Sequence, residues 1–330
     1  MGGKKMEKMV MTSYGVYTPL RYEMIKPQLP SKTKEYLTQV FDKQAKMWIE
    51  QFDKQVELLL DKWHLTIVGQ EENSKFGAVF YTFSLEHGKT VLKMIPPFSK
   101  RMKQEIYCYQ SLPYAEMCPM LEYDSDIGAI LLQYFPGNKE QDLDDYLSLF
   151  QCMKKERRFV TENEEVTDYW SVWEESAACA IKGKQNLSAE YENLLTNCLE
   201  QSNKLMPYAK ELPKYYVHGD AHVHNIVGNK ELVLIDPIGY NAPFGIEYAR
   251  FVGTWYRENL IETDELKEVL RSLSDNMQDY LHNCLMLALD VTFRMCNTFS
   301  EGNTQAEICD AIHWAWNVWQ AIGMITPVTV

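Results

Sequence analysis

The chain has 330 residues, which is enough for one large domain or for two lobes. Its 46 acidic residues outnumber its 33 Lys and Arg residues, so the formal net charge is −13 at pH 7. This balance argues against sequence-independent binding to nucleic acid, which depends on Lys and Arg at phosphates. It suits a cationic small molecule, and it is equally compatible with an acidic protein that gains only solubility from its charge.

The eight cysteines lie between Cys108 and Cys309 and form no C-x-x-C pair. This pattern favours reduced thiols over a disulfide scaffold or a zinc ribbon. The N-terminus carries basic residues but lacks the apolar core of a signal peptide. No window approaches about 18 uninterrupted apolar residues. We therefore expect a cytoplasmic protein that does not span a membrane.

The first 64 residues predict an arm followed by helices. Prolines interrupt the chain up to about residue 30. Ser31 or Thr33 is a suitable N-cap for a helix that begins near Lys34. Apolar residues at steps of three and four then predict a second helix over 47–63, in which they pack against a core.

Strands dominate the next part, which we delimit as 65–136. The predicted strands are 65–70, 78–85, 89–95, 120–123 and 129–135, with a helix over 99–112 between the third and the fourth. His87-Gly88 forms the turn of a hairpin. The last strand ends in Pro136-Gly137, which breaks the chain and marks the boundary to the third part, 137–330.

The third part is mostly helical. The segment 142–212 is helical and rich in charge, and further helices are expected over 263–274, 277–298 and 305–325. Between these two groups of helices lie two short apolar stretches that end in polar residues, and they carry the most informative pattern of the sequence.

The first stretch reads H-G-D-x-x-x-x-N from His218 to Asn225, and the second ends in Asp236. Phosphoryl transfer from a nucleotide needs a carboxylate that orients and deprotonates a hydroxyl, oxygen ligands for Mg²⁺, and a cation at the phosphates. Asp220 fits the first role, and Asn225 and Asp236 fit the second. A polar turn between two strands uses the same residue types, but it does not explain the second carboxylate.

These motifs resemble the aminoglycoside phosphotransferase branch of the protein-kinase-like fold. More narrowly, the chain is similar to the streptomycin 6-kinase and hydroxyurea phosphotransferase group, from about Trp48 to the C-terminus. The resemblance implies a bilobal α+β fold, with an antiparallel sheet in a small nucleotide-binding N-lobe and a larger, mostly helical C-lobe. It also implies ATP and Mg²⁺ as cofactors, and Asp220 as the catalytic residue.

The same resemblance implies further nucleotide contacts. Lys93, a charge among apolar strand neighbours, would hold the phosphates and pair with Glu105 on the following helix. Ser74 would contact phosphate, although its loop contains only Gly77 and so departs from G-x-G-x-x-G. The backbone of Gln133 and Phe135 would bind the adenine.

The acceptor implied by the resemblance is an aminoglycoside such as streptomycin, and the activity would confer antibiotic resistance. Acidic residues beside Tyr169, Trp170 and Trp173 suit a cationic substrate, and a solvated helix face explains them equally well. The candidates for substrate binding in this acidic run are Asp168 and Glu174, and the run also contains Glu162, Glu164, Glu165 and Glu175. Two further candidates lie outside it: Glu247, and Asp290, a pocket carboxylate candidate because its neighbours over 285–293 are apolar. Where related enzymes usually carry Asp-x-Ala, this chain has Glu247 followed by Tyr248 and Ala249.

Other functions stay open at this stage. The kinase could act on another small alcohol or an amine-containing metabolite, as a monomer or a dimer. His218, His222 and His224 with Asp236 are also compatible with a zinc or two-metal hydrolase. A pseudokinase is a third alternative, but Lys93 and the three C-lobe residues that it would have lost are all present.

Overall fold

The computed structural model describes residues 9–10, 18–19, 26–72, 74–137, 142–161, 166–229, 231–300 and 303–323. The chain divides into two compact units, each with its own hydrophobic core. The first unit runs to Lys103 and includes Met120–Tyr134. The second contains Gln104–Pro119 and continues from Phe135. No helix in the described ranges is long and apolar enough to cross a membrane.

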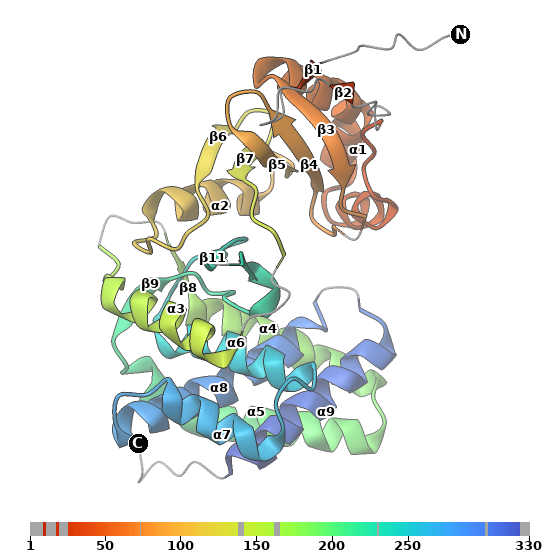
Figure 1. Cartoon of the computed structure of the whole chain (residues 1–330). Coiled ribbons are helices and arrows are strands. Elements are labelled where there is room, and N and C mark those ends of the chain that lie inside the picture. Colours follow the sequence, from red (N-terminus) through yellow and green to blue (C-terminus); the bar gives the residue numbers. More distant parts are fainter. Residues whose placement is uncertain are drawn as a thin grey trace. The chain divides into compact units, whose positions relative to one another are not determined.

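A five-stranded antiparallel sheet forms the centre of the first unit (Figure 1). Its strands are β3 (Leu65–Gln70), β4 (Ala78–Ser84), β5 (Gly88–Met94), β6 (Met120–Asp124) and β7 (Ala129–Gln133), in the order β3-β4-β5-β7-β6. These bounds lie within one or two residues of the predicted strands. Two further short strands, β1 (Met9–Val10) and β2 (Thr18–Pro19), pair with each other.

One long helix, α1 (Ser31–Lys62), covers one face of this sheet through buried apolar residues. Non-helical backbone at Asp42, where φ is +40° and ψ is −107°, divides α1 into two helical segments, in keeping with the two predicted helices, although the break lies before residue 47. The predicted cap was wrong, because the helix already begins at Ser31 and neither candidate caps it. The Thr33 hydroxyl donates instead to the carbonyl oxygens of Ser74 and Gly77, which ties the helix to the loop before β4.

The opposite face of the sheet carries Lys93. Successive residues of a strand point to opposite faces, and Leu92 and Met94 belong to the core beneath α1. Lys93 therefore points away from α1, beside Val79 of β4 and Ile130 of β7. Its side chain is among the buried charged groups of the chain.

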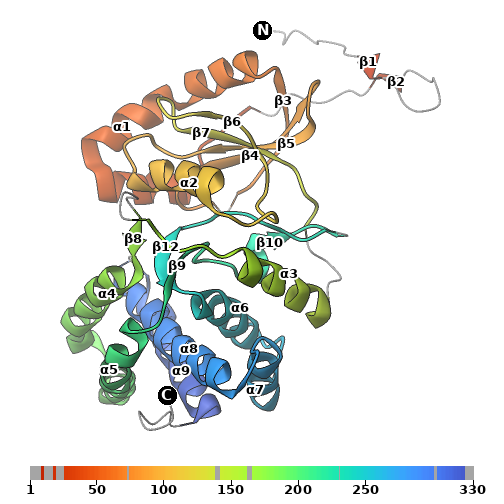
Figure 2. The same cartoon turned by 90° about the vertical axis from the view of Figure 1, so that its left-hand side faces the viewer.

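Helices make up most of the second unit (Figure 2). They are α3 (Leu143–Glu156), α4 (Tyr169–Gly183), η1 (Lys184–Asn186), α5 (Ala189–Lys210), α6 (Gly245–Arg257), α7 (Thr263–Ser272), α8 (Met277–Asn297) and α9 (Gln305–Ile322). Helix α8 contacts α4, α5, α6, α7 and α9, and is the centre of this group. The helix α2 (Lys100–Ser111) crosses the boundary, since it joins the second unit from Gln104 onward.

Short strands connect these helices and position the motif residues. The strands β8 (Thr167–Asp168), β12 (Tyr240–Pro243) and β9 (Lys214–Val217) form one small sheet in that order. Beyond the short helix η2 (Val223–Asn225), β10 (Ile226–Val227) pairs with β11 (Val233–Leu234). The sequence analysis did not predict α6, although polar residues recur along it at steps of three and four, at Glu247, Arg250, Thr254 and Arg257. Most of this stripe is buried together with the rest of Ile246–Thr254, so it is not the solvent-exposed face of a surface helix.

Candidate active site

Backbone hydrogen bonds bring the two motifs together. β9 ends at Val217, which pairs with Tyr240 of β12, so the segments after one strand and before the other run side by side. The N–H groups of Ile238 and Gly239 both donate to the carbonyl oxygen of His218, at 3.0 and 2.9 Å. The N–H of Ile235 donates to the carbonyl oxygen of Asn225 at 2.9 Å. The segments that contain Asp220 and Asp236 are therefore held against each other.

Gly219 has a geometric reason to be glycine. Its φ is +77°, a left-handed conformation that side chains disfavour. A Cβ atom at this position would also lie 2.5 Å from the ring of Tyr240. The glycine of the His-Gly-Asp motif thus permits both the sharp turn before Asp220 and the close approach of β12.

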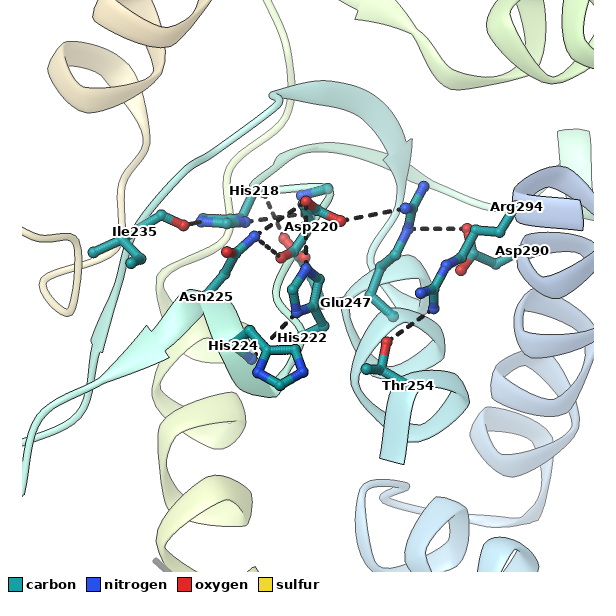
Figure 3. Close-up of polar contacts among 12 residues, drawn as sticks. His218, Asp220, His222, His224, Asn225, Ile235, Glu247, Thr254, Asp290 and Arg294 are labelled. Carbon is teal, nitrogen blue, oxygen red and sulfur yellow. Dashed lines mark hydrogen bonds and ion pairs between the residues drawn. The ribbon is translucent and has the colours of Figure 1, made fainter. Parts of the chain in front are cut away.

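Different side chains hold the two oxygens of Asp220 (Figure 3). The Asn225 amide donates to Oδ2 at 3.1 Å and to the Asp220 carbonyl oxygen at 3.0 Å. Nη1 of Arg250 lies 3.3 Å from Oδ1, and Nε2 of His222 lies 3.6 Å from Oδ2. Burial by itself would raise the pKa of Asp220, but His222 and the charge of Arg250 hold it well below its usual range. Asp220 is therefore a carboxylate at neutral pH.

His218 is fully buried, and both nitrogens of its ring have partners. Nε2 lies 3.0 Å from the carbonyl oxygen of Ile235, and Nδ1 accepts from the N–H of Asp220 at 3.2 Å. A carbonyl can only accept, so the ring carries its proton on Nε2 and is neutral. Burial lowers the pKa of His218 to about 4. The histidine is thus a structural link between the two motifs.

This arrangement predicts a pH-dependent stability. The unfolded histidine has a pKa near 6.5 and the folded one near 4, so the unfolded state binds the proton more readily. The corresponding stability is present above pH 6.5 and is lost as the pH falls toward 4, by about 3 kcal/mol. Urea unfolding of the wild type and of His218→Gln at several pH values measures it.

The His218→Gln curve should be flatter over this range than the wild-type curve. His313→Gln, which alters an exposed histidine of α9, is the matched control and should keep the wild-type slope. Equal slopes for wild type and His218→Gln would show that the histidine is not buried in its neutral form.

Glu247, expected near the substrate, is fully buried at the start of α6. Its carboxyl oxygens accept from the backbone N–H groups of His218, at 2.5 Å, and Gly219, at 3.2 Å. Burial raises the pKa of Glu247 to about 8, although both N–H donors oppose the rise. In this position the side chain offers no surface to a ligand, and it holds the turn that precedes Asp220.

Glu247→Gln should destabilise the fold by about 1–3 kcal/mol, because the new NH₂ group would face a backbone N–H that needs an acceptor. The free energy of unfolding in urea measures the effect. Glu268→Gln, at an exposed position of α7, is the control and should change little. A Glu247→Gln protein as stable as the wild type would contradict the assigned hydrogen bonds.

Asp236 lies two residues beyond β11 and has a φ of +58°, which is uncommon for a residue with a side chain. Its N–H donates to the hydroxyl of Tyr109 on α2 at 3.1 Å. Gln104, from the same helix, donates to the carbonyl oxygen of Gly239 at 3.1 Å. The part of α2 that belongs to the second unit therefore fixes the backbone around Asp236.

The side-chain oxygens of Asn225 and Asp236 suit Mg²⁺, which prefers carboxylate and carbonyl ligands. Asn225 uses its NH₂ group on Asp220, so its Oδ1 is the atom that can serve a cation. Asp236 supplies a carboxylate on the neighbouring segment. These residues therefore fit the predicted metal ion.

The contacts of the three histidines do not match the zinc site that the sequence suggested for them together with Asp236. His218 is occupied by backbone groups, and His224 Nε2 contacts Glu258 at 2.5 Å. His222 lies beside Asp220. Within the described ranges, no three His, Cys, Asp or Glu side chains are grouped to hold a metal ion.

The predicted nucleotide contacts fall in both units. In the first unit, Lys93 is 8% exposed on β5, Gln133 ends β7 and is exposed, and Ser74 is partly buried. In the second, Glu105 is 1% exposed on α2 and Phe135 is partly buried. The residues predicted to contact the nucleotide are thus divided between the two units.

Gly77, the one glycine of the loop before β4, is required by packing. A Cβ atom there would lie 1.9 Å from the carbonyl oxygen of Met94. The glycine therefore lets this loop approach β5 closely, whether or not the loop also contacts phosphate.

The acidic substrate candidates do not gather in one place. Asp168 accepts from the backbone N–H of Ser171 as the N-cap of α4, and it pairs with Lys214 at 3.1 Å. Glu174 is exposed and pairs with Lys210. The aromatic residues of this segment, Tyr169, Trp170 and Trp173, are buried core residues and offer no ring to a substrate. Glu175 is exposed, and Glu162, Glu164 and Glu165 lie outside the described residues.

Asp290, the fourth acidic candidate, is fully buried on α8. Its Oδ1 lies 3.0 Å from Nε of Arg250 and accepts from the hydroxyl of Tyr169 at 3.0 Å. Sequence reasoning missed Arg250, although a charge inside the apolar run of α6 is the same signal that singled out Lys93. Asp290 is therefore connected to Asp220 through Arg250.

The sequence matches no protein-family model and no curated protein. The structure does resemble solved kinases. Choline kinase LicA from Streptococcus pneumoniae gives a TM-score of 0.56 at 13% identity, over 82% of this chain and 99% of that one. A choline/ethanolamine kinase family protein from Mesorhizobium loti gives 0.55 at 11% identity, over 82% and 98%. A thermostable mutant of aminoglycoside phosphotransferase APH(4)-Ia, in complex with AMP-PNP and hygromycin B, gives 0.55 at 13% identity, over 81% and 96%.

The chain has a protein-kinase-like fold. The predicted α+β class is confirmed, with an antiparallel sheet of five strands followed by a mostly helical region. At 11–13% identity these likenesses show the fold alone. The narrower resemblance to the streptomycin 6-kinase and hydroxyurea phosphotransferase group gains no support from these comparisons and stays a prediction.

Proposed function

We propose that this protein is an ATP- and Mg²⁺-dependent phosphotransferase that acts on a hydroxyl group of a small molecule. One observation carries the proposal: the side chain of Asp220 lies between Asn225 and Arg250, and the segment with Asp236 is hydrogen-bonded to the same turn. Structures that share the fold include one solved with AMP-PNP and hygromycin B, which supports a nucleotide and a small acceptor as ligands.

In the proposed reaction Asp220 orients the acceptor hydroxyl and takes its proton. The hydroxyl oxygen bonds to the γ-phosphorus as the bond from that phosphorus to the bridging oxygen breaks, and ADP leaves with the electron pair. When bound, Mg²⁺ would neutralise phosphate charge, held by Asn225 and Asp236. Positioning and charge supply most of the rate enhancement.

The remaining predicted roles belong to the same proposal. Residues 65–136 would bind the nucleotide, with Lys93 as the phosphate-binding cation and Glu105 as its partner. Ser74 would contact phosphate, and the backbone of Gln133 and Phe135 would contact adenine. Residues 137–330 would carry catalysis and acceptor binding.

For the acceptor we propose a cationic alcohol of the aminoglycoside type, with streptomycin as the first candidate. The net charge of −13 favours a cation. Choline-like alcohols are the second candidate, because choline kinases share the fold. Asp168 and Glu174 are partly or fully exposed and stay candidates for this contact, whereas Glu247 and Asp290 hold other parts of the protein.

ADP release from ATP, measured with Mg²⁺ and a panel of acceptors, tests the proposal. The panel contains streptomycin, other aminoglycosides, hydroxyurea, choline and simple sugars. We expect one cationic alcohol to stimulate ADP release, and we expect EDTA to abolish it. Nucleotide binding without stimulation by any hydroxyl compound would instead favour a pseudokinase, and zinc-dependent hydrolysis without nucleotide would favour the metallohydrolase.

A further inference from the structure

Helices α6 and α8 bury an ion pair in the core of the second unit. Arg250 is 5% exposed and Asp290 is 0% exposed, and Nε of the first lies 3.0 Å from Oδ1 of the second. Arg294, one turn beyond Asp290, is partly buried and donates to the Thr254 hydroxyl at 2.9 Å. Figure 3 draws Asp290, Arg294 and Thr254 together on one side of Asp220.

Stability alone is a weak reason for this pair. Removing two charges from water is costly, and apolar residues of similar volume often replace such a pair without loss. Here the hydrogen bonding is also incomplete, because Nε and Nη2 of Arg250 and Oδ2 of Asp290 are buried without a hydrogen-bond partner, and Nε contacts Asp290 only as an ion pair. Because the buried pair contributes so little to stability, we looked to its contacts with Asp220 for another role.

The orientation of Arg250 indicates that role. Nη1 of its guanidinium approaches Oδ1 of Asp220, while Asn225 donates to Oδ2. Each oxygen of the carboxylate is thus held from a different element, which restricts rotation of the carboxylate plane. Asp290 holds the other side of the same guanidinium, and the Tyr169 hydroxyl in turn donates to Asp290.

We propose that Arg250 is a positioning residue that fixes the Asp220 carboxylate for the acceptor hydroxyl, and that Asp290 on α8 holds Arg250 in place. The inference rests on the proposed function and deepens it. It assigns to Asp290 of α8, which lies 70 residues beyond Asp220 in the sequence, a part in the geometry of the catalytic loop.

The alternative is that the pair only joins α6 to α8, and a double substitution separates the two roles. Arg250→Met and Asp290→Asn each leave a buried charge without its main partner, so each should lower the midpoint of urea unfolding. The double variant removes both charges, so its midpoint of urea unfolding should return most of the way to the wild-type value. The expected recovery follows from the pair's weak contribution to stability.

Activity should not recover with stability if Arg250 positions Asp220. The double variant should keep the wild-type KM for ATP and lose about 10²-fold in kcat, the usual effect of a misplaced reacting group. Arg257→Met with Asp310→Asn is the matched control, since it removes an exposed Arg–Asp pair that joins α6 to α9. The control should keep the wild-type kcat.

Hydrogen exchange gives a readout that needs no turnover. Amides of residues 218–227 should exchange faster in the double variant than in the wild type, despite the recovered unfolding midpoint. A double variant with wild-type exchange in this segment and wild-type kcat would overturn the proposal. If the wild type transfers no phosphoryl group, the proposed function fails, and exchange alone then decides whether Arg250 fixes the loop.

Discussion

Asp220→Asn should lower kcat by about 10²–10⁴-fold, the range for the loss of a group that moves a proton in the transition state. An amide cannot take the proton of the acceptor hydroxyl. The NH₂ group of the new Asn would also face a hydrogen-bond donor, because each carboxylate oxygen of Asp220 accepts from a neighbouring side chain. Steady-state kinetics with the stimulating acceptor measure the loss.

Binding of Mg·ATP should be largely unchanged in Asp220→Asn, because the residue is assigned to the acceptor hydroxyl. Titration calorimetry with a non-hydrolysable nucleotide tests this separately from turnover. Asp310→Asn, an exposed position on α9, is the control for the substitution type and should keep full activity. Turnover of Asp220→Asn within about tenfold of the wild type would remove this residue from the catalytic role.

Lys93→Met should lower kcat/KM for ATP by about 10²–10³-fold, because the transition state would lose a fixed cation at the phosphates. Methionine keeps an unbranched chain on the sheet face opposite α1, so the strand pairing of β5 should survive. The KM for the acceptor should stay near its wild-type value. Initial rates over a range of ATP concentrations measure the effect.

Lys89→Met is the matched control, since Lys89 lies on the same strand four residues earlier and is exposed. It should keep the wild-type kcat/KM for ATP. Equal, small losses of kcat/KM for ATP in the two variants would mean that Lys93 does not bind the phosphates. The nucleotide role would then pass to another residue.

The sequence was informative where local patterns decide the structure. Strands β3 to β7 alternate between buried and less buried residues or are bounded by turns, so their ranges could be predicted closely. The spacing from Asp220 to Asn225 and the carboxylate at Asp236 marked the candidate site, and the structure brings their segments together. These features depend on residues close to one another in the chain.

The rest depends on partners far apart in the sequence. Tyr109 and Asp236 are 127 residues apart, and Tyr169 and Asp290 are 121 apart, so no local pattern predicts these contacts. Asp290 was interpreted as a pocket carboxylate because a charge in an apolar helix is unusual. The same burial can instead reflect an internal pair, and only the position of Arg250 distinguishes the two cases.

The fate of the γ-phosphoryl group tests the central claim most directly. Wild-type protein would be incubated with Mg²⁺, the stimulating acceptor and ATP labelled with ¹⁸O on its γ-phosphate, and the products analysed by mass spectrometry. We predict a phosphate ester of the acceptor that retains the labelled oxygens, with its bridging oxygen supplied by the unlabelled hydroxyl. Label found only in inorganic phosphate, whichever hydroxyl compound is present, would contradict transfer to a small molecule.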